Sequence, residues 1–418
     1  MQDQLAIDST FATPEGAGEV RYFARQPILN RDGRVHAYEL LFRNGPGAAS
    51  RGDGSMATGT MIDNAVIFGL EQLTTGLPAF INCTSEAITE KLVTVLPPER
   101  TVLGIPATLE INSSIVGACR ELNREGFRFL LDDFIWSATL DPLLDLADYV
   151  RVDYTRLDDL DSRCLQRGSG KSTSIVVKKV DTQENYQKAS AAGCTFFQGD
   201  YFCHPDLLKK NKIPANRLSH FDIVRQLHND PIDIRQISRL VMRDPALTYR
   251  LLRLVNSPLY ATHREVCSIE SAIMIIGDLA LRRIVSLAIL SEINADQPPE
   301  ILHMALVRGR FCELAARFCW LNPPEQYLLG MFSMVSAMLR VPIKDVKSLL
   351  PLRNQICRAL EGEKNHERAL LTWLEFHEHA DWESCDTIGN SIGLSHDKLM
   401  LCYVDAVVWA QITLSAVI

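Results

Sequence analysis

Polar side chains stand near the downstream ends of seven short stretches that are rich in apolar and β-branched residues. They are Glu39, Asn82, Glu110, Asp132 with Asp133, Asp153, Lys178 and Gln198. Carboxylates and an amide that converge on one point form an oxygen-rich site suited to Mg²⁺ or Mn²⁺. Two such ions could activate water and stabilise the transition state of phosphodiester hydrolysis. Taken singly, each residue is equally well explained as a helix cap or a loop contact.

The stretches that carry these residues alternate with helix-like segments between about Arg21 and Pro205. We expect strands within VRYFARQPIL, VHAYELLF, PAFINC, ATLEIN, FRFLLDDF, YVRVD, SIVVKKV and CTFFQGDYF. Strands that alternate with helices indicate parallel βαβ units, and about eight of them favour a closed (β/α)8-type barrel. Functional side chains of that fold project from the carboxyl ends of its strands, which would bring the polar residues together.

The character of the chain changes after Pro205. Residues 206–220 are polar and indicate a linker, and residues 221–418 show helical spacing, as in ILHMALVRGRFCELAARFCW. We therefore predict an α/β barrel over residues 20–205, followed by an all-helical domain. Residues 1–19 lack periodicity and contain Gly and Pro, so we expect a flexible tail there.

Composition limits the classes of function. The 418 residues carry a net charge of −8, without the basic excess that is typical of a nucleic-acid binder. The first residues lack the basic-then-apolar pattern of a signal peptide, so we expect none, and the apolar segment AVVWAQITLSAVI is too short to span a bilayer. The 11 cysteines form no C-x-x-C pair, which favours reduced, buried thiols. We expect a cytoplasmic protein without nucleic-acid or membrane partners.

Six motifs, in order, resemble those of the EAL domain, the cyclic di-GMP phosphodiesterase barrel. The matching segments are RQPILNRDGRVHAYELLFR, FINCTS, LEINSS, LLDDF, VRVD and FFQGDYF. The resemblance implies that Glu39 stands at the Glu of the signature, Asn82 at the metal-binding Asn, and Glu110 at the first acid of E-L-T-E. It also implies that Gln26 and Arg43 lie near the nucleotide of the family.

Several positions depart from that pattern. Ser113 stands at the second acid of E-L-T-E, Arg151 at the catalytic lysine of K-I-D, and Lys178 at a Glu of A-E-G-V-E-T. The loop after D-D-F reads IWSATLD, where the family has G-T-G-Y-S-S-L. Since added positive charge opposes the binding of a divalent cation, we expect no catalytic metal and little or no phosphodiesterase activity.

The two lysines at the end of SIVVKK need an explanation of their own. We expect the Lys178 ammonium to occupy the metal's place and to neutralise the cluster of Glu39, Glu110, Asp132 and Asp153. Lys179, on the opposite face of the strand, is expected to meet a helix or solvent. The alternative is that both lysines merely extend into water from a strand end.

The helical region carries a second resemblance. The segment from Arg243 to Leu290, with LLRLVNSPLY and SIESAIMIIGDLALRRIV as its specific parts, is similar to an HDOD domain, the non-catalytic relative of HD-type phosphohydrolases. A catalytic HD domain would carry His-Asp after LLG, where this chain has Ser333 and Met334. The resemblance therefore implies no dinuclear hydrolase centre. His377 and His379 are two apart, so on a helix they are not expected to share a metal.

Together the resemblances imply a degenerate EAL–HDOD signalling protein. We expect a catalytically inactive adaptor that acts through contacts with other signalling proteins. Two alternatives stay open, namely a sensor that binds cyclic di-GMP without cleaving it, and an active phosphodiesterase that uses Mg²⁺ or Mn²⁺. The partner, the input signal, the pathway and self-association into a homo-oligomer are not determined by the sequence.

Overall fold

A computed structural model of the chain describes eleven stretches of it. They are residues 22–43, 69–106, 109–135, 140–159, 173–203, 220–224, 226, 233–256, 266, 268–350 and 352–417. The expected tail at residues 1–19 lies outside the described residues. So does the expected linker, except for its last residue, His220, which is helical and buried.

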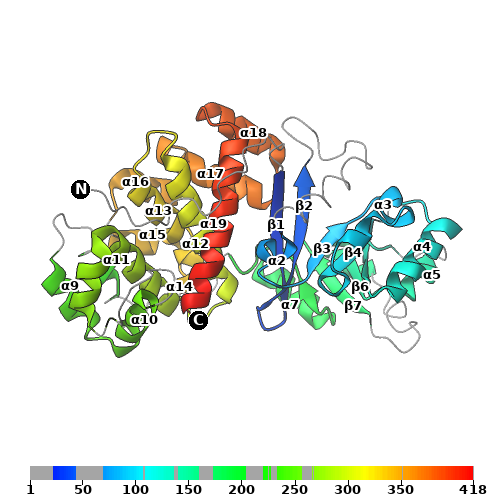
Figure 1. The fold of residues 1–418 in the computed structure, drawn as a ribbon, viewed down its shortest axis with the longest axis horizontal. Helices are drawn as coiled ribbons and strands as arrows, with labels where there is room; N and C mark the ends of the chain where they lie inside the picture. Colours follow the sequence, from blue (N-terminus) through cyan, green and yellow to red (C-terminus); the bar gives the residue numbers. More distant parts are fainter. Residues whose placement is uncertain are drawn as a thin grey trace.

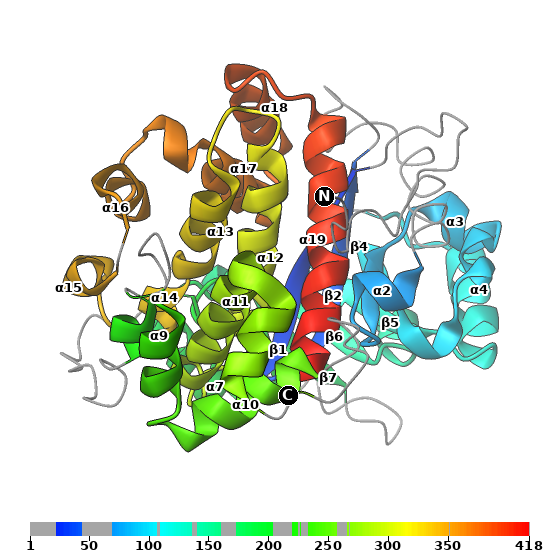
Figure 2. The same cartoon turned by 60° about the vertical axis from the view of Figure 1, so that its left-hand side comes forward.

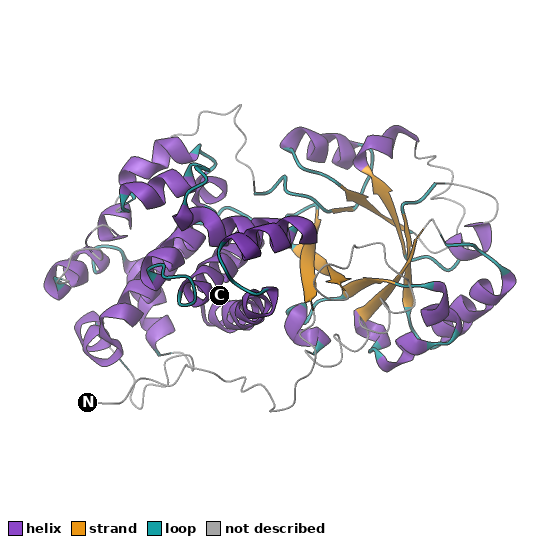
Figure 3. Ribbon diagram, turned by 90° about the horizontal axis from the view of Figure 1, so that it is seen from above, coloured by secondary structure: helices purple, strands orange, loops and turns teal. Residues whose placement is uncertain are grey.

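Eight strands close into a barrel, which confirms the predicted α/β part (Figure 3). They are β1 (Tyr22–Asn30), β2 (Val35–Arg43), β3 (Ala79–Asn82), β4 (Thr101–Pro106), β5 (Arg128–Asp132), β6 (Tyr149–Asp153), β7 (Ser174–Lys178) and β8 (Phe196–Phe197). From β2 to β8 the neighbouring strands are parallel. However, β1 runs antiparallel to both β2 and β8, so β1 and β2 form a hairpin rather than a βαβ unit.

The strand expected within ATLEIN is wrong. The fourth strand is TVLGIP (Thr101–Pro106), whose first five residues are buried, and residues 109–112 form a loop instead. The reason lies in Asn112, whose side chain accepts a hydrogen bond from the backbone N–H of Ile115 at 3.0 Å. That bond caps the following helix, so the polar end of this segment starts a helix rather than ending a strand.

Helices and short 3-10 turns surround the barrel. The described ones are α2 (Leu70–Leu73), α3 (Ser85–Thr89), η1 (Leu92–Val95), η2 (Pro98–Arg100), α4 (Ser113–Arg124), α5 (Asp141–Leu144), η4 (Tyr154–Asp159) and α7 (Gln183–Ala191). Inside the barrel, one apolar layer takes a side chain from every strand: Ile28, Ala37, Phe80, Val102, Leu130, Tyr149, Val176 and Phe196. Because side chains alternate between the two faces of a strand, the residues two positions closer to the mouth also face inward.

Every regular element that the structure describes beyond residue 220 is a helix, as predicted. The elements of this second part are α9 (Ile234–Val241), α10 (Pro245–Val255), α11 (Ile269–Ile293), α12 (Pro299–Ala316), α13 (Pro323–Phe332), α14 (Val335–Leu339), α15 (Ile343–Val346), η6 (Lys347–Leu349), α16 (Asn354–Leu360), η7 (His366–Arg368), α17 (Ala369–Glu378), α18 (Trp382–Ser391) and α19 (His396–Val417). Helices α12 and α13 cross in close contact, since a Cβ on Gly330 would lie 2.3 Å from the carbonyl oxygen of Arg308. This crossing places Arg308 beside the end of α13.

The helical part packs against the β1–β2 hairpin (Figures 1 and 2). The rings of Phe23 in β1 and Tyr403 in α19 lie 5.7 Å apart between centroids, and the Tyr38 hydroxyl of β2 donates to Glu300 of α12 at 2.8 Å. In the described part of the chain, only His396–Ser415 of α19 is long and apolar enough to cross a membrane by length and composition. Here that helix packs against α12, and Ala406, Val407 and Ala410 are fully buried, so its apolar side belongs to the core.

Candidate functional site between the barrel mouth and the helical domain

A second inward-facing layer lies at the mouth of the barrel. Its members are Gln26, Glu39, Asn82, Gly104, Asp132, Arg151, Lys178 and Gln198, each two residues from the apolar-layer position of its strand. Seven of them line a single cavity, and Gly104 contributes no side chain. The structure thus brings together six residues named from the sequence and adds Arg151, which the sequence marked only as a substitution.

Arg151 occupies the centre of this layer. Its Nε donates to Asp132 Oδ1 at 2.7 Å and its Nη2 to Asp132 Oδ2 at 2.5 Å. The same Nη2 lies 2.7 Å from Glu39 Oε1, and Nη1 lies 2.7 Å from Glu39 Oε2. Nη1 also donates to Gln198 Oε1 at 3.1 Å. One buried guanidinium therefore joins two carboxylates and an amide across the barrel.

The charges of this cluster stabilise one another. Burial by itself would lower the pKa of Arg151, but the carboxylates of Glu39 and Asp132 more than offset it and hold that pKa above its ordinary value. Burial would likewise raise the pKa of Asp132, yet the hydrogen bonds and positive charge of Arg151, helped by Lys178, hold it below its ordinary value. Both groups are consequently ionised at neutral pH.

Gln198 links the cluster to the first strand. Its amide nitrogen donates to Glu39 Oε2 at 2.6 Å and to Gln26 Oε1 at 2.9 Å. The next residue, Gly199, has φ of +145°, and a Cβ there would lie 2.3 Å from the Val180 carbonyl oxygen. Only glycine fits this close approach, which fixes Gln198 at the end of β8. Asn82 completes the layer by donating to Glu39 Oε1 at 3.1 Å.

The expectation for Lys178 is corrected in part. Its ammonium lies 2.5 Å from Asp133 and 3.8 Å from Asp132, at the edge of the cluster, because the guanidinium of Arg151 already fills the centre. Asp153 is not held by Lys178 either. It pairs with the exposed Lys179 at 2.6 Å, and although its partial burial acts in the opposite direction, this pairing and the bonds from Thr155 lower the pKa of Asp153 to about 2.

The placement of Glu110 in the site is wrong. Glu110 lies four residues beyond the end of β4 and is exposed to solvent. Among the residues that the structure describes, it has no hydrogen bond or ion pair with the cluster. The inward position of β4 at this level is Gly104, and a Cβ there would lie 2.4 Å from Asn82 Oδ1. The fourth strand therefore supplies no acid.

The residues of this layer do not fit a divalent metal. The oxygens of Glu39 and Asp132 accept hydrogen bonds from Arg151, Gly104 offers no ligand, and Lys178 adds a second positive charge nearby. Within the described ranges, no group of three or more His, Cys, Asp or Glu residues could hold a metal ion.

A second arginine faces the cavity from the helical side. Arg308 forms a forked ion pair with Glu378, through Nη2 at 2.6 Å and Nε at 3.0 Å. Its Nη1 donates at 3.2 Å to Ser333, the residue that the resemblance aligns with the His of a catalytic HD domain. Burial would lower the pKa of Arg308, but Glu378 outweighs it and keeps this pKa above its ordinary value.

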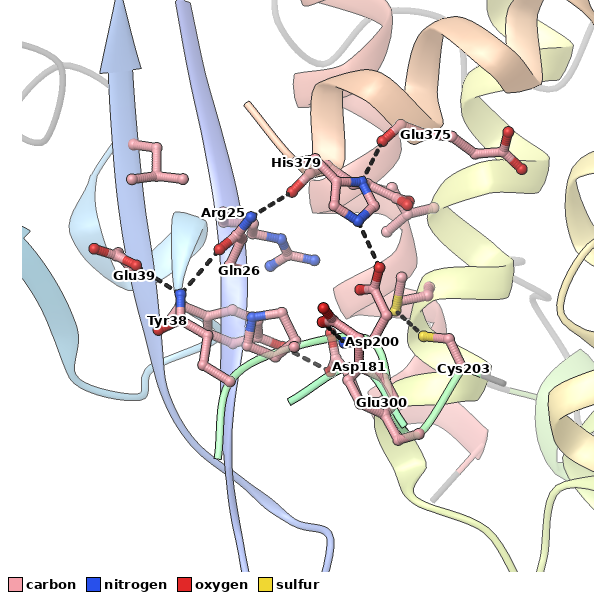
Figure 4. Close-up of a pocket in the computed structure, with 18 of the residues that line it drawn as sticks. Arg25, Gln26, Tyr38, Glu39, Asp181, Asp200, Cys203, Glu300, Glu375 and His379 are labelled. Atoms are coloured by element: carbon pink, nitrogen blue, oxygen red, sulfur yellow. Dashed lines mark hydrogen bonds and ion pairs between the residues drawn. The ribbon is translucent and has the colours of Figure 1, made fainter. Parts of the chain in front are cut away.

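The two halves enclose a cavity of about 840 Å³ (Figure 4). The amide nitrogen of Gln26 reaches across from β1 to the backbone carbonyl of Glu378 at 3.1 Å. Next to it, His379 Nε2 and Asp200 Oδ2 form an ion pair at 2.5 Å, and its hydrogen bond is the main cause that raises the pKa of His379 to about 9. His377, by contrast, is buried with its ring stacked on Trp373, and burial lowers its pKa to about 3.

Arg43 also meets the helical domain. Its guanidinium is buried and holds both oxygens of Asp386 in α18, with Nη1 at 3.1 Å and Nη2 at 2.6 Å. Glu378, His379 and Asp386 could not be predicted as partners of the barrel, because these contacts depend on how the two domains dock.

Known proteins are similar to this chain over most of its length. Residues 213–335 match the HDOD domain family. The chain is 30% identical over 399 residues to the cyclic di-GMP phosphodiesterase CdgJ of Vibrio cholerae, covering 93% of this chain and 92% of that protein. It is 29% identical over 402 residues to the uncharacterized protein YuxH of Bacillus subtilis, covering 93% and 98%.

Solved structures similar to the barrel part include two that contain cyclic di-GMP. A standalone EAL protein from Vibrio cholerae O395 has 21% identity and a TM-score of 0.34, over 44% of this chain and 92% of that one. The FimX EAL domain from Pseudomonas aeruginosa has 17% identity and a TM-score of 0.33, over 44% and 89%. The barrel fold itself follows from the strand pairing.

Proposed function

Since the chain belongs to the EAL–HDOD family, we propose that it is a cyclic di-GMP signalling protein that does not hydrolyse the nucleotide and acts through contacts with other proteins. One observation carries this proposal: the guanidinium of Arg151 holds Glu39 and Asp132, two of the carboxylates that the sequence predicts for a metal site. Gly104 supports it, because the fourth strand then lacks an acid. The Arg308–Glu378 pair beside Ser333 argues in the same direction for the helical half.

The test is a hydrolysis assay on the purified full-length protein with cyclic di-GMP and Mg²⁺ or Mn²⁺. We expect no linear product above background, and no rise in melting temperature when either ion is added. An active EAL enzyme serves as the positive control. Turnover within about tenfold of that control, lost in Glu39→Ala, would refute the proposal.

The name of the Vibrio cholerae relative favours a rival function, an active phosphodiesterase. The same assay separates the two, because an active enzyme must bind a metal at the acids that Arg151 now holds. Affinity capture from the native cell tests the binding of partner proteins. The full-length protein and Arg151→Met, compared under conditions in which both are folded, should capture different proteins only if partners bind at the mouth of the barrel.

A second candidate is a sensor that binds cyclic di-GMP without cleaving it. The cavity favours it, because its volume falls within the usual range for ligand pockets, and Lys178 and Lys179 place positive charge at its rim. Equilibrium titration of the nucleotide, with and without Mg²⁺, tests this candidate. Binding that does not depend on the metal would support it.

A further inference from the structure

Two residues that the family resemblance places near the nucleotide are engaged by the helical domain instead. Arg43 is only 4% exposed and binds both carboxylate oxygens of Asp386 in α18. Gln26 donates its amide hydrogen to the backbone carbonyl of Glu378, the last residue of α17. Both contacts come from the consecutive helices α17 and α18.

Gln26 and Arg43 differ in whether a ligand in the cavity could reach them. Gln26 lines it, together with Arg151 and Lys178, whereas Arg43 does not. A ligand that entered the cavity would therefore meet the amide of Gln26 but could not reach the guanidinium of Arg43 while Asp386 holds it. The carbonyl of Trp382 at the start of α18 accepts from the same guanidinium at 3.5 Å, so α18 covers Arg43 with backbone as well as side chain.

We propose that the α17–α18 segment is a built-in competitor of the nucleotide, so that the closed arrangement seen here and a barrel that holds cyclic di-GMP through Arg43 exclude each other. This inference rests on the nucleotide-binding form of the proposed function. A guanidinium fork matches a carboxylate and a phosphate by the same geometry, and one fork cannot hold both. Nucleotide binding must first break the Arg43–Asp386 pair, and it therefore releases α18 from the barrel.

The proposal predicts the direction in which the Arg43–Asp386 contact changes the affinity for the nucleotide. If the state with Arg43 released is a minor one, the apparent dissociation constant exceeds the intrinsic one by the inverse of its population. Any change that weakens the Asp386 contact raises that population and tightens nucleotide binding. Reciprocally, the nucleotide favours the released state of α18, which is how a signal in the barrel would reach the helical domain.

The experiment compares cyclic di-GMP affinity in the full-length protein and in Asp386→Ala, by isothermal titration calorimetry. We expect the variant to bind about tenfold more tightly, since a charged hydrogen-bonded pair no longer competes. Asp405→Ala is the matched control, because Asp405 pairs with Arg310 inside the helical domain. It should bind like the parent. Adding Arg43→Ala to Asp386→Ala should abolish the gain.

Hydrogen exchange of the unmodified protein provides a second readout that needs no variant to fold. Saturating nucleotide should speed exchange in Trp382–Ser391 and leave the barrel helix Ser113–Arg124 unchanged. Equal affinities of parent and Asp386→Ala with unchanged exchange in α18 would overturn the inference, as would the absence of nucleotide binding in both proteins. Tighter binding accompanied by hydrolysis would instead refute the inactive function and leave the competition intact.

Discussion

The barrel and the helical domain each hold a buried arginine that is forked on carboxylates, but the surroundings of the two differ. Arg151 joins Asp132, Glu39 and Gln198, which come from three other strands or their ends. Arg308 holds a single carboxylate, that of Glu378, and one hydroxyl. The barrel site balances two buried acids with one guanidinium, whereas the helical site pairs one guanidinium with one acid and a hydroxyl. We therefore expect the barrel to depend more strongly on its buried cation than the helical domain does.

The largest expected effect follows from removing that cation. Arg151→Met should lower the free energy of unfolding by about 3–5 kcal/mol at pH 7, because it takes the guanidinium away from two buried carboxylates. Urea denaturation measures this loss. Arg156→Met, an exposed arginine just beyond the same strand, should change stability by less than about 0.5 kcal/mol. Equal losses in the two variants would contradict the central role of Arg151.

The same variant has a defined pH dependence. The pKa of Asp132 is lowered in the folded parent, so its stabilising contribution is present above the ordinary carboxyl pKa and is lost as the pH falls through the folded value. Without Arg151, burial would raise that pKa, and Asp132 would take up a proton at a higher pH. The deficit of Arg151→Met should therefore shrink as the pH is lowered from 7 toward 4.5.

Removing Arg308 should destabilise the fold less than removing Arg151. Arg308→Met uncovers one carboxylate that water can partly reach, so we expect a loss of about 2 kcal/mol. A double-mutant cycle with Glu378→Gln isolates the pair, and the two single losses should not add. Additive losses would mean that the ion pair contributes nothing beyond the packing of the two side chains.

Lys178 sharpens the comparison within the barrel. Its direct partner, Asp133, is more than half exposed, so Lys178→Met should cost less than about 1 kcal/mol. The surface pair of Lys188 and Asp158 gives the reference, and Lys188→Met should have a similarly small effect. A loss as large as that of Arg151→Met would restore Lys178 as the main counter-charge of the cluster.

The smallest effect concerns the contact between the domains. The pKa of His379 is raised to about 9, so the stabilisation from its ion pair with Asp200 is complete below pH 6.5 and is lost as the pH rises through 9. Since the His379 side chain is about half exposed, this contribution stays below about 1 kcal/mol. Parent and His379→Gln should differ in melting temperature at pH 6 and converge at pH 10, whereas His366→Gln should match the parent at both.

The candidate site could be predicted from the sequence wherever a motif ends a strand. Glu39, Asn82, Asp132 and Gln198 meet because each stands two residues beyond an apolar inward position. The prediction for Glu110 was wrong because the fourth strand is Thr101–Pro106, and its inward residue, Gly104, has no side chain that would indicate a site.

The role of Arg151 could not be inferred from its position alone. A lysine or a metal would also satisfy Glu39 and Asp132, and only the side-chain geometry shows that the guanidinium reaches both. The fold class followed from alternating strands and helices, but the reversed direction of β1 did not. Two adjacent strand-like segments predict a hairpin only when the turn between them is recognised, and here it is the short turn around Gly33.

The antiparallel hairpin of β1 and β2 also has a kinetic consequence. The hairpin can form locally and early. The outer edge of β1 is paired only after β8, the last strand, has been made, when Leu29 pairs with Phe197 and Asn30 with Phe196. Closing the barrel is thus its most non-local step, and the loop-closure entropy for the whole segment falls on that step. The helical domain packs on this same hairpin. During synthesis, the interface between the two domains therefore forms on a pair of strands whose outer edge is completed only when β8 pairs with β1.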